Sequence, residues 1–90
     1  MQFEYDPDKS AKNETKHGID FDEAQGLWDG PVLTVRLNYP DEPRWAAIGM
    51  LRGKHWTAII TYRGERTRII SVRRSHPKEE RAYDEAVRER

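Results

Sequence analysis

Two short turns in the second half of the chain constrain its fold more than any other feature of the sequence. Each contains a glycine, and each joins segments in which apolar and polar residues alternate, as they do in β-strands. The turns are Arg52-Gly53 and Arg63-Gly64-Glu65, and the segments are residues 44–51, 54–62 and 66–74. Because turns this short connect antiparallel neighbours, the sequence predicts a three-stranded meander. Residues 32–37 alternate in the same way and form a further candidate strand.

Helix boundary signals lie on both sides of this meander. Asp6-Pro7 is a typical helix start, and His17-Gly18 is a typical helix end. Asp20 is expected to begin a second helix of about ten residues, and His76-Pro77 is expected to open a last one. The predicted fold class is therefore α+β, an antiparallel meander packed with two N-terminal helices and one C-terminal helix. Its length suits a single domain, residues 1–90.

The composition excludes several classes of protein. The chain has no cysteine, which excludes a disulfide scaffold, a thiolate metal site and a cysteine nucleophile. No basic segment followed by an apolar run opens the chain, and no long apolar stretch occurs. Neither export nor membrane insertion is therefore expected, and the predicted location is cytoplasmic. The net charge of zero and the aromatic content of 10% argue against disorder.

Charge is distributed unevenly along the chain, although the formal net charge is zero. Residues 1–42 contain ten acidic and four basic residues, whereas residues 43–78 contain nine basic residues and one acidic residue. A separation of charge of this kind indicates a surface that binds nucleic acid.

Arginines are densest over residues 66–74, on a predicted strand. Strict alternation along that strand would place Arg68 with Arg74 and away from Arg73. A guanidinium group binds phosphate or carboxylate, so the expected partners are RNA phosphates or, alternatively, acids of the N-terminal third. Arg73 and Arg74 also precede the helix that opens at His76-Pro77, whose free backbone N–H groups would help to bind one phosphate.

Two groups of residues resemble the signatures of a known family. The first comprises Phe3-Glu4-Tyr5-Asp6-Pro7, Lys9, Asn13, Lys16-His17-Gly18 and Phe21-Asp22-Glu23-Ala24. The second comprises Arg68-Ile69-Ile70-Ser71-Val72-Arg73-Arg74, Glu80-Arg81 and Tyr83. Together they resemble the opening and closing signatures of the BrnT toxins of bacterial toxin–antitoxin pairs, except that Tyr5 stands where tryptophan is common. The resemblance implies a compact ribonuclease toxin related in fold to RelE, neutralised by a BrnA-type antitoxin that also binds operator DNA.

Cleavage of RNA without a metal requires three chemical functions. The ribose 2′-hydroxyl must lose its proton, the charge on phosphorus must be stabilised, and the 5′-oxygen must be protonated. Arg73 matches the family motif best and is the expected contact of the scissile phosphate. The other expected catalytic residues are Lys16, His17 and Glu80, and the expected contacts of RNA phosphates are Arg68, Arg74 and His76. No cofactor is expected, and the three histidines lack the spacing of metal ligands.

Structural roles remain open for these residues. His17 ends a helix before a glycine, and His76 begins one. Glu80 would serve either as a base or as the ion-pair partner of Arg73. His55 lies beside a turn and is expected to be solvated.

The antitoxin is expected to place acidic residues against Arg66, Arg68 and Arg74, and operator DNA would be reached only through the antitoxin. Two other functions remain open. In the first, the chain is a module that binds RNA or protein without cutting. In the second, it is a structural subunit whose arginines pair with its own acids. Only the first of these two would bind RNA with an affinity that falls steeply as salt rises.

Overall fold

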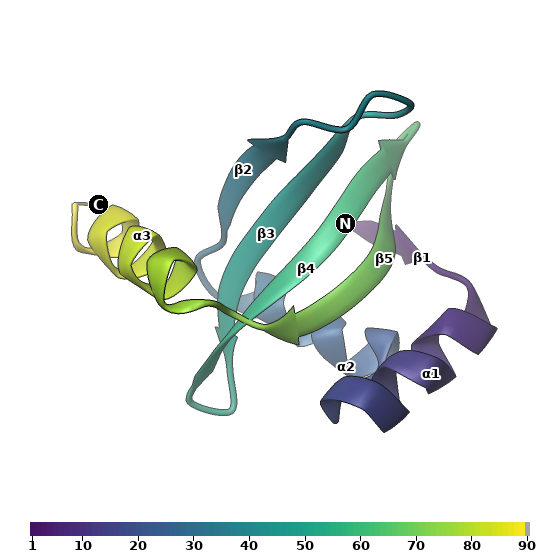
Figure 1. Cartoon of the computed structure of the whole chain (residues 1–90), viewed down its shortest axis with the longest axis horizontal. Coiled ribbons are helices and arrows are strands. Elements are labelled where there is room, and N and C mark those ends of the chain that lie inside the picture. Colours follow the sequence, from purple (N-terminus) through teal and green to yellow (C-terminus); the bar gives the residue numbers. More distant parts are fainter. Residues whose placement is uncertain (90) are drawn as a thin grey trace.

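A computed structural model describes residues 1–89 of the chain (Figure 1). The strands are β1 Gln2–Glu4, β2 Leu33–Leu37, β3 Arg44–Leu51, β4 Lys54–Arg63 and β5 Arg66–Arg74, and the helices are α1 Pro7–His17, α2 Phe21–Ala24, the 3₁₀ helix η1 Gln25–Asp29 and α3 Pro77–Arg88. The strands form one sheet in the order β1-β5-β4-β3-β2. The α+β class is confirmed, but the sheet is mixed rather than purely antiparallel, because β1 runs parallel to β5.

The ends of α1 are formed as the sequence predicts. The Asp6 carboxylate accepts hydrogen bonds from the backbone N–H groups of Asp8 and Lys9, at 2.8 and 3.4 Å. Gly18 ends the helix with φ of 79°, a left-handed conformation that glycine adopts without steric cost.

The second helix begins where predicted, but it is not a continuous α-helix. Asp20 and Glu23 form a reciprocal capping box at its start. After Ala24 the chain tightens into η1, and Gly26 lies in this stretch. Glycine in a helix interior costs about 1 kcal/mol relative to alanine, which weakens α-helix propagation at this point.

The predicted meander of β3, β4 and β5 is confirmed, and β2 extends it. Arg52 and Gly53 have φ of 54° and 73°, as a tight hairpin turn of the favoured hand requires. The sequence interpretation missed β1, because three residues are too few to establish an alternating pattern. β1 is held by its register against β5, where Phe3 lies opposite Thr67.

One extra residue interrupts the alternation of side chains along β5. Ile59 pairs with Ser71 and Ile60 pairs with Ile69, which leaves Ile70 unpaired in a β-bulge.

This bulge overturns the predicted placement of the arginines. Ile69 and Val72 are both buried in the same core, although they are three residues apart. The arginines before the bulge therefore share a side with Arg73, and Arg74 lies on the opposite side. The prediction that Arg68 points with Arg74 and away from Arg73 is wrong.

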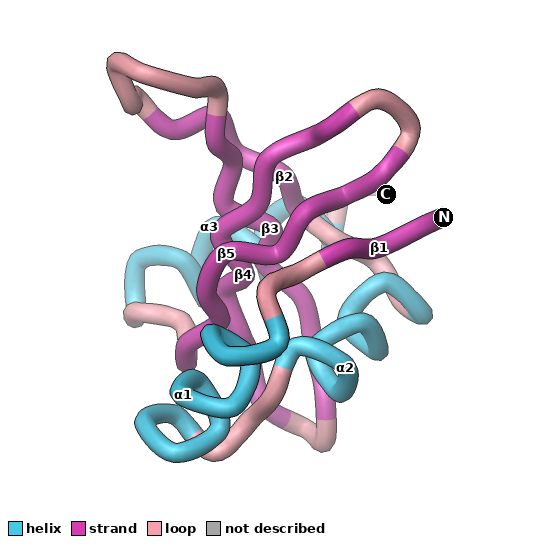
Figure 2. Tube along the Cα trace, turned by 90° about the vertical axis from the view of Figure 1, so that its right-hand side faces the viewer, coloured by secondary structure: helices cyan, strands magenta, loops and turns pink. Residues whose placement is uncertain are grey.

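The hydrophobic core lies between the sheet and the N-terminal helices, on the side that we call the core face (Figure 2). Ile19, Phe21 and Leu27 are fully or almost fully buried there against Ile60 and other strand residues. Helix α3 lies on the opposite side, the α3 face (Figure 1). No helix within residues 1–89 has the length and apolar character needed to cross a membrane.

Candidate functional site

Asn13 of α1 joins the two groups of signature residues. Its side-chain nitrogen donates to the carbonyl oxygens of Ile19 and Val72, both at 2.9 Å, and its side-chain oxygen accepts from the Val72 N–H at 3.1 Å. Strand β1 ends opposite Arg68, so this part of β5 has no neighbouring strand on that side. The Asn13 amide therefore supplies the two hydrogen bonds that a neighbouring strand would make.

These hydrogen bonds of Asn13, which we call the clamp, hold the last turn of α1 next to the end of β5 (Figures 1 and 2). The last turn carries Lys16, which is exposed, and His17, which is half-buried. His17 follows Asn13 by one helical turn and therefore lies on the same side of α1. Neither Lys16 nor His17 forms an ion pair with another residue of the described chain, residues 1–89.

Arg74 is the exposed arginine at the end of β5. Its guanidinium carbon lies 5.5 Å from the centre of the Trp56 ring, and its Nε donates to the carbonyl oxygen of His55 at 3.1 Å. No carboxylate within residues 1–89 forms an ion pair with it. Its two terminal nitrogens are consequently available to an anion from outside the chain.

Arg73 is bound to a carboxylate of the chain itself. Its Nη1 and Nη2 donate to the two carboxylate oxygens of Glu79 at 2.8 and 2.9 Å. The same carboxylate accepts from the backbone N–H of His76 at 2.7 Å and from the Thr57 hydroxyl at 3.2 Å. The Glu79 carboxylate thus binds at the start of α3, where the sequence analysis expected a phosphate. The suggestion that Glu80 is the ion-pair partner of Arg73 is wrong, because Glu79 fills that role.

These contacts stabilise the ionised form of Glu79. The hydrogen bonds from Arg73 are the largest cause, and together with the other donors they lower the pKa of Glu79 from 4.5 to about 2. The pKa of Arg73 is raised by the same pair.

Replacing Glu79 with glutamine is expected to change the acid stability of the fold. Because the pKa of Glu79 is lower in the folded chain, the ion pair stabilises the fold fully above pH 4.5 and loses its effect as pH falls toward 2. For a partly exposed pair the effect should be about 1–2 kcal/mol. Urea unfolding of the parent and Glu79→Gln between pH 7 and pH 2 measures it. The exposed Glu85, on the same helix, provides the matched control Glu85→Gln. Equal pH profiles for parent and Glu79→Gln would contradict this account.

His55 is more constrained than the sequence interpretation expected. Its Nε2 lies 2.7 Å from an Asp84 carboxylate oxygen, and its side chain is 18% exposed. Its Nδ1 lies 3.9 Å from a carboxylate oxygen of Glu80, and the Tyr83 ring meets it edge-on. The expectation that His55 is solvated is wrong, because α3 covers it. Glu80 therefore lies beside His55 on the α3 face, whereas Lys16 and His17 belong to α1.

His76 is the N-cap residue of α3, and its side chain is 68% exposed. Its Nδ1 is 3.8 Å from the Glu79 carboxylate. The structure therefore gives His76 a role at the helix start, beside the end of β5.

Two other basic residues pair with acids of the N-terminal third. Arg68 donates to Glu4 at 2.8 Å, and Arg52 forms an ion pair with Glu23. Internal pairing, which the sequence interpretation kept open, is confirmed for these two arginines. Arg66 is exposed and forms no ion pair within residues 1–89.

One group of three carboxylates has ligand atoms close enough to surround a cation. The group consists of Glu14, Asp20 and Glu23, whose oxygen atoms lie within 4.8 Å of one another. Asp20 and Glu23 already bind backbone N–H groups of α2, and Glu23 also pairs with Arg52. Helix capping and an ion pair therefore account for the contacts of Asp20 and Glu23.

Sequence reasoning gave no site role to Asn13 or Glu79, although both are central to the contacts at the end of β5. A signal for Glu79 was present, since it follows the N-cap His76 by three residues, the spacing of a capping box. Asn13 gave no such local signal, because its partner Val72 lies 59 residues away in the sequence.

None of the curated proteins matches the chain. The family described as ribonuclease toxin, BrnT, of type II toxin–antitoxin systems matches residues 5–79. The matched span includes α1 and β5 with their signature residues, while Glu80 and most of α3 lie beyond it. The chain therefore belongs to the BrnT family of ribonuclease toxins of type II toxin–antitoxin systems.

Proposed function

We propose that this toxin cleaves RNA by metal-independent acid–base chemistry at the end of β5. The observation that carries the proposal is the pair of hydrogen bonds between Asn13 and Val72, because they hold the helix that ends in Lys16 and His17 against the strand that ends in Arg74. The site then combines a half-buried imidazole, an ammonium group and a guanidinium group free of carboxylates. These are the groups that phosphodiester cleavage needs.

Each group has one role in the proposed reaction. His17 accepts the proton of the ribose 2′-hydroxyl, whose oxygen attacks phosphorus. Arg74 stabilises the negative charge that develops on the phosphate oxygens. The bond from phosphorus to the 5′-oxygen breaks, and Lys16 gives that oxygen a proton. The products are a 2′,3′-cyclic phosphate and a free 5′-hydroxyl group.

We assign the phosphate contact to Arg74 rather than to Arg73. Arg73 is held by Glu79, so an RNA phosphate would have to compete with a carboxylate that makes two hydrogen bonds to it. In this proposal Arg73 and Glu79 fix the start of α3, and His76 is a further phosphate contact. Glu80 takes no part in proton transfer, because it lies beside His55.

The proposal extends to partners. Membership of a type II family supports a BrnA-type antitoxin, with operator DNA reached only through it, and a fold related to RelE. Arg66 and Arg74 are the proposed contacts for acidic residues of the antitoxin, since neither has a carboxylate partner within residues 1–89. Arg68 is a weaker candidate, because Glu4 would have to leave it first.

The test is an RNA cleavage assay in excess EDTA with the purified toxin. Cleavage should persist in EDTA, and the new 3′ ends should carry 2′,3′-cyclic phosphates. Loss of cleavage in EDTA with recovery on adding Mg²⁺ would exclude the metal-independent reaction. RNA that is bound but never cut would identify a non-catalytic binding module instead, and the salt dependence of that binding would measure its phosphate contacts.

A further inference from the structure

An apolar groove of about 190 Å³ separates α3 from strands β2 and β3. We call it the α3 groove. Its lining residues are Val35, Leu37, Ala46, Ile48 and Ala82, with Lys78 and Glu79 in the first turn of α3. Ala46 and Ile48 are buried, but Val35 is 43% exposed and Ala82 is exposed as well.

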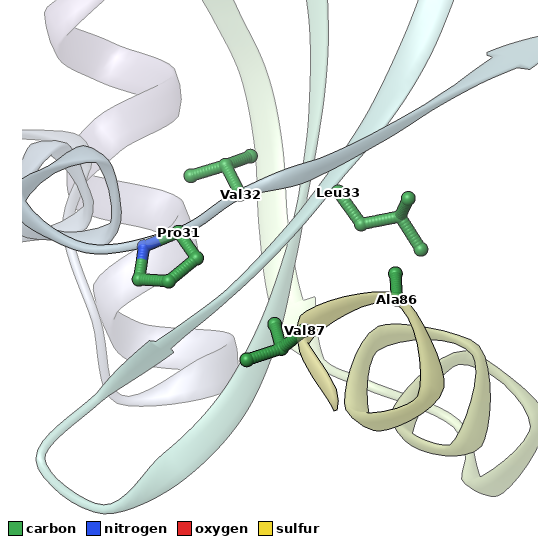
Figure 3. A pocket seen from close by; sticks show the side chains of 5 residues that line it. All are labelled: Pro31, Val32, Leu33, Ala86 and Val87. Carbon is green, nitrogen blue, oxygen red and sulfur yellow. The ribbon is translucent and has the colours of Figure 1, made fainter. Parts of the chain in front are cut away.

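The apolar lining continues along α3 beyond this groove. A second hollow of about 130 Å³ lies between the last turns of α3 and the start of β2. In Figure 3, Leu33 of β2 extends toward Ala86 of α3, and Val87 is the next residue of the helix. Leu33, Val35 and Leu37 are alternate residues of β2, so they face the same side of the sheet. That side of β2 therefore presents a row of aliphatic side chains beneath α3.

Strand β2 is also an open edge of the sheet. It is last in the strand order, and no strand within residues 1–89 pairs with its outer side. The opposite edge is the three-residue strand β1, which pairs with the first part of β5, and Asn13 binds the next part of β5. An edge strand offers unpaired N–H and C=O groups that accept an added strand.

We propose that an extended segment of the antitoxin docks here as an added strand on β2, with its alternate apolar side chains in the α3 groove. Main-chain hydrogen bonds to an exposed edge and side-chain pockets beside it are the two components of strand addition. The inference rests on the proposed function only in taking the antitoxin as partner.

The chemistry of the groove favours a polypeptide over RNA. Its lining is aliphatic and contains no aromatic ring on which a base would stack. Lys78 is exposed and has no ion-pair partner within residues 1–89, so an acidic residue of the docked segment would complement it. The expected segment is therefore amphipathic, with alternating apolar residues and at least one acid.

Binding of the purified antitoxin to toxin variants tests this surface. Val35→Asp and Ala82→Arg place a charge in the groove at exposed positions, where the fold should tolerate it. Each should weaken binding by at least ~100-fold, since a charge buried without a partner is costly. Thr34→Asp is the matched control, because Thr34 is exposed on the same strand but faces the opposite side. Its affinity should stay within about threefold of the parent.

A photoreactive side chain introduced at position 35 gives an independent measurement. It should crosslink to the antitoxin, and the same group at the exposed position 15 of α1 should not. Unchanged affinity of both groove variants would overturn the proposal, and so would a crosslink from position 35 to a second toxin molecule. Neither measurement uses RNA cleavage. If the toxin cuts no RNA, the proposed function is wrong, but the binding and crosslinking results still test the docking surface.

Discussion

Replacing Arg74 with alanine is expected to lower kcat/KM for RNA cleavage by roughly 10²–10³-fold, with little change in stability. Removal of one group that stabilises the developing charge of a transition state typically has an effect of this size. Arg74 is exposed and forms no ion pair within residues 1–89, so its loss leaves no acid unpaired. Cleavage of a short labelled RNA, with urea unfolding of the same preparation, measures both quantities.

Arg36→Ala is the matched control for this experiment. Arg36 is also exposed and also lies over a tryptophan ring, 5.1 Å from the centre of Trp45, but it belongs to β2 at the far edge of the sheet. Its replacement should leave cleavage within about threefold of the parent. If Arg74→Ala cleaves RNA like the parent while a stable Arg73→Ala does not, the phosphate contact belongs to Arg73 and our assignment is reversed.

Replacing Asn13 with leucine is expected to destabilise the fold by about 3–5 kcal/mol. Asn13 is 7% exposed, and its amide makes three hydrogen bonds to backbone groups. Leucine has a similar size but leaves the polar groups of Val72 and Ile19 without a partner, at a cost of about 1–3 kcal/mol for each buried group. Urea unfolding at neutral pH measures the loss.

Thr15→Ala is the control for Asn13. Thr15 lies on the same helix, is exposed and makes one hydrogen bond, to the Ala11 carbonyl oxygen within the helix. Its replacement should change the free energy of unfolding by no more than about 0.5 kcal/mol. An Asn13→Leu protein as stable as the parent would show that water or a rearranged edge satisfies β5, and the clamp would then not explain the position of His17.

The features that the sequence predicted well depend on residues within one helical turn or one hairpin. The start of α1 at Asp6, its end at Gly18 and the turn at Arg52-Gly53 are all set by local backbone preferences. Glu79 was missed although its signal is equally local, since Glu79 at the third helical position reaches back to His76.

The features that escaped prediction depend on partners far along the chain. β1 exists only because β5 accepts it, and three residues carry no period of their own. The bulge at Ile70 is visible only in the register of β5 against β4. The predicted positions of the site arginines were affected most, because the face that each arginine occupies follows from that register. The function class could be predicted from the sequence, because the charge asymmetry and the two signature groups can be recognised without knowing how the strands pair.

The bulge at Ile70 has a consequence for how this family member tolerates change in length. In a regular strand, losing one residue moves every later side chain to the other face of the sheet. In β5 the unpaired Ile70 already shifts the alternation of side chains by one residue. A chain without Ile70 would therefore keep Arg68 and Arg73 on the α3 face and Arg74 on the core face. A one-residue deletion at this point would straighten the strand while preserving the placement of its arginines, whereas a deletion within β3 or β4 would exchange buried and exposed residues. Ile70 is thus the place in the sheet where evolution can shorten the chain without redistributing its charge.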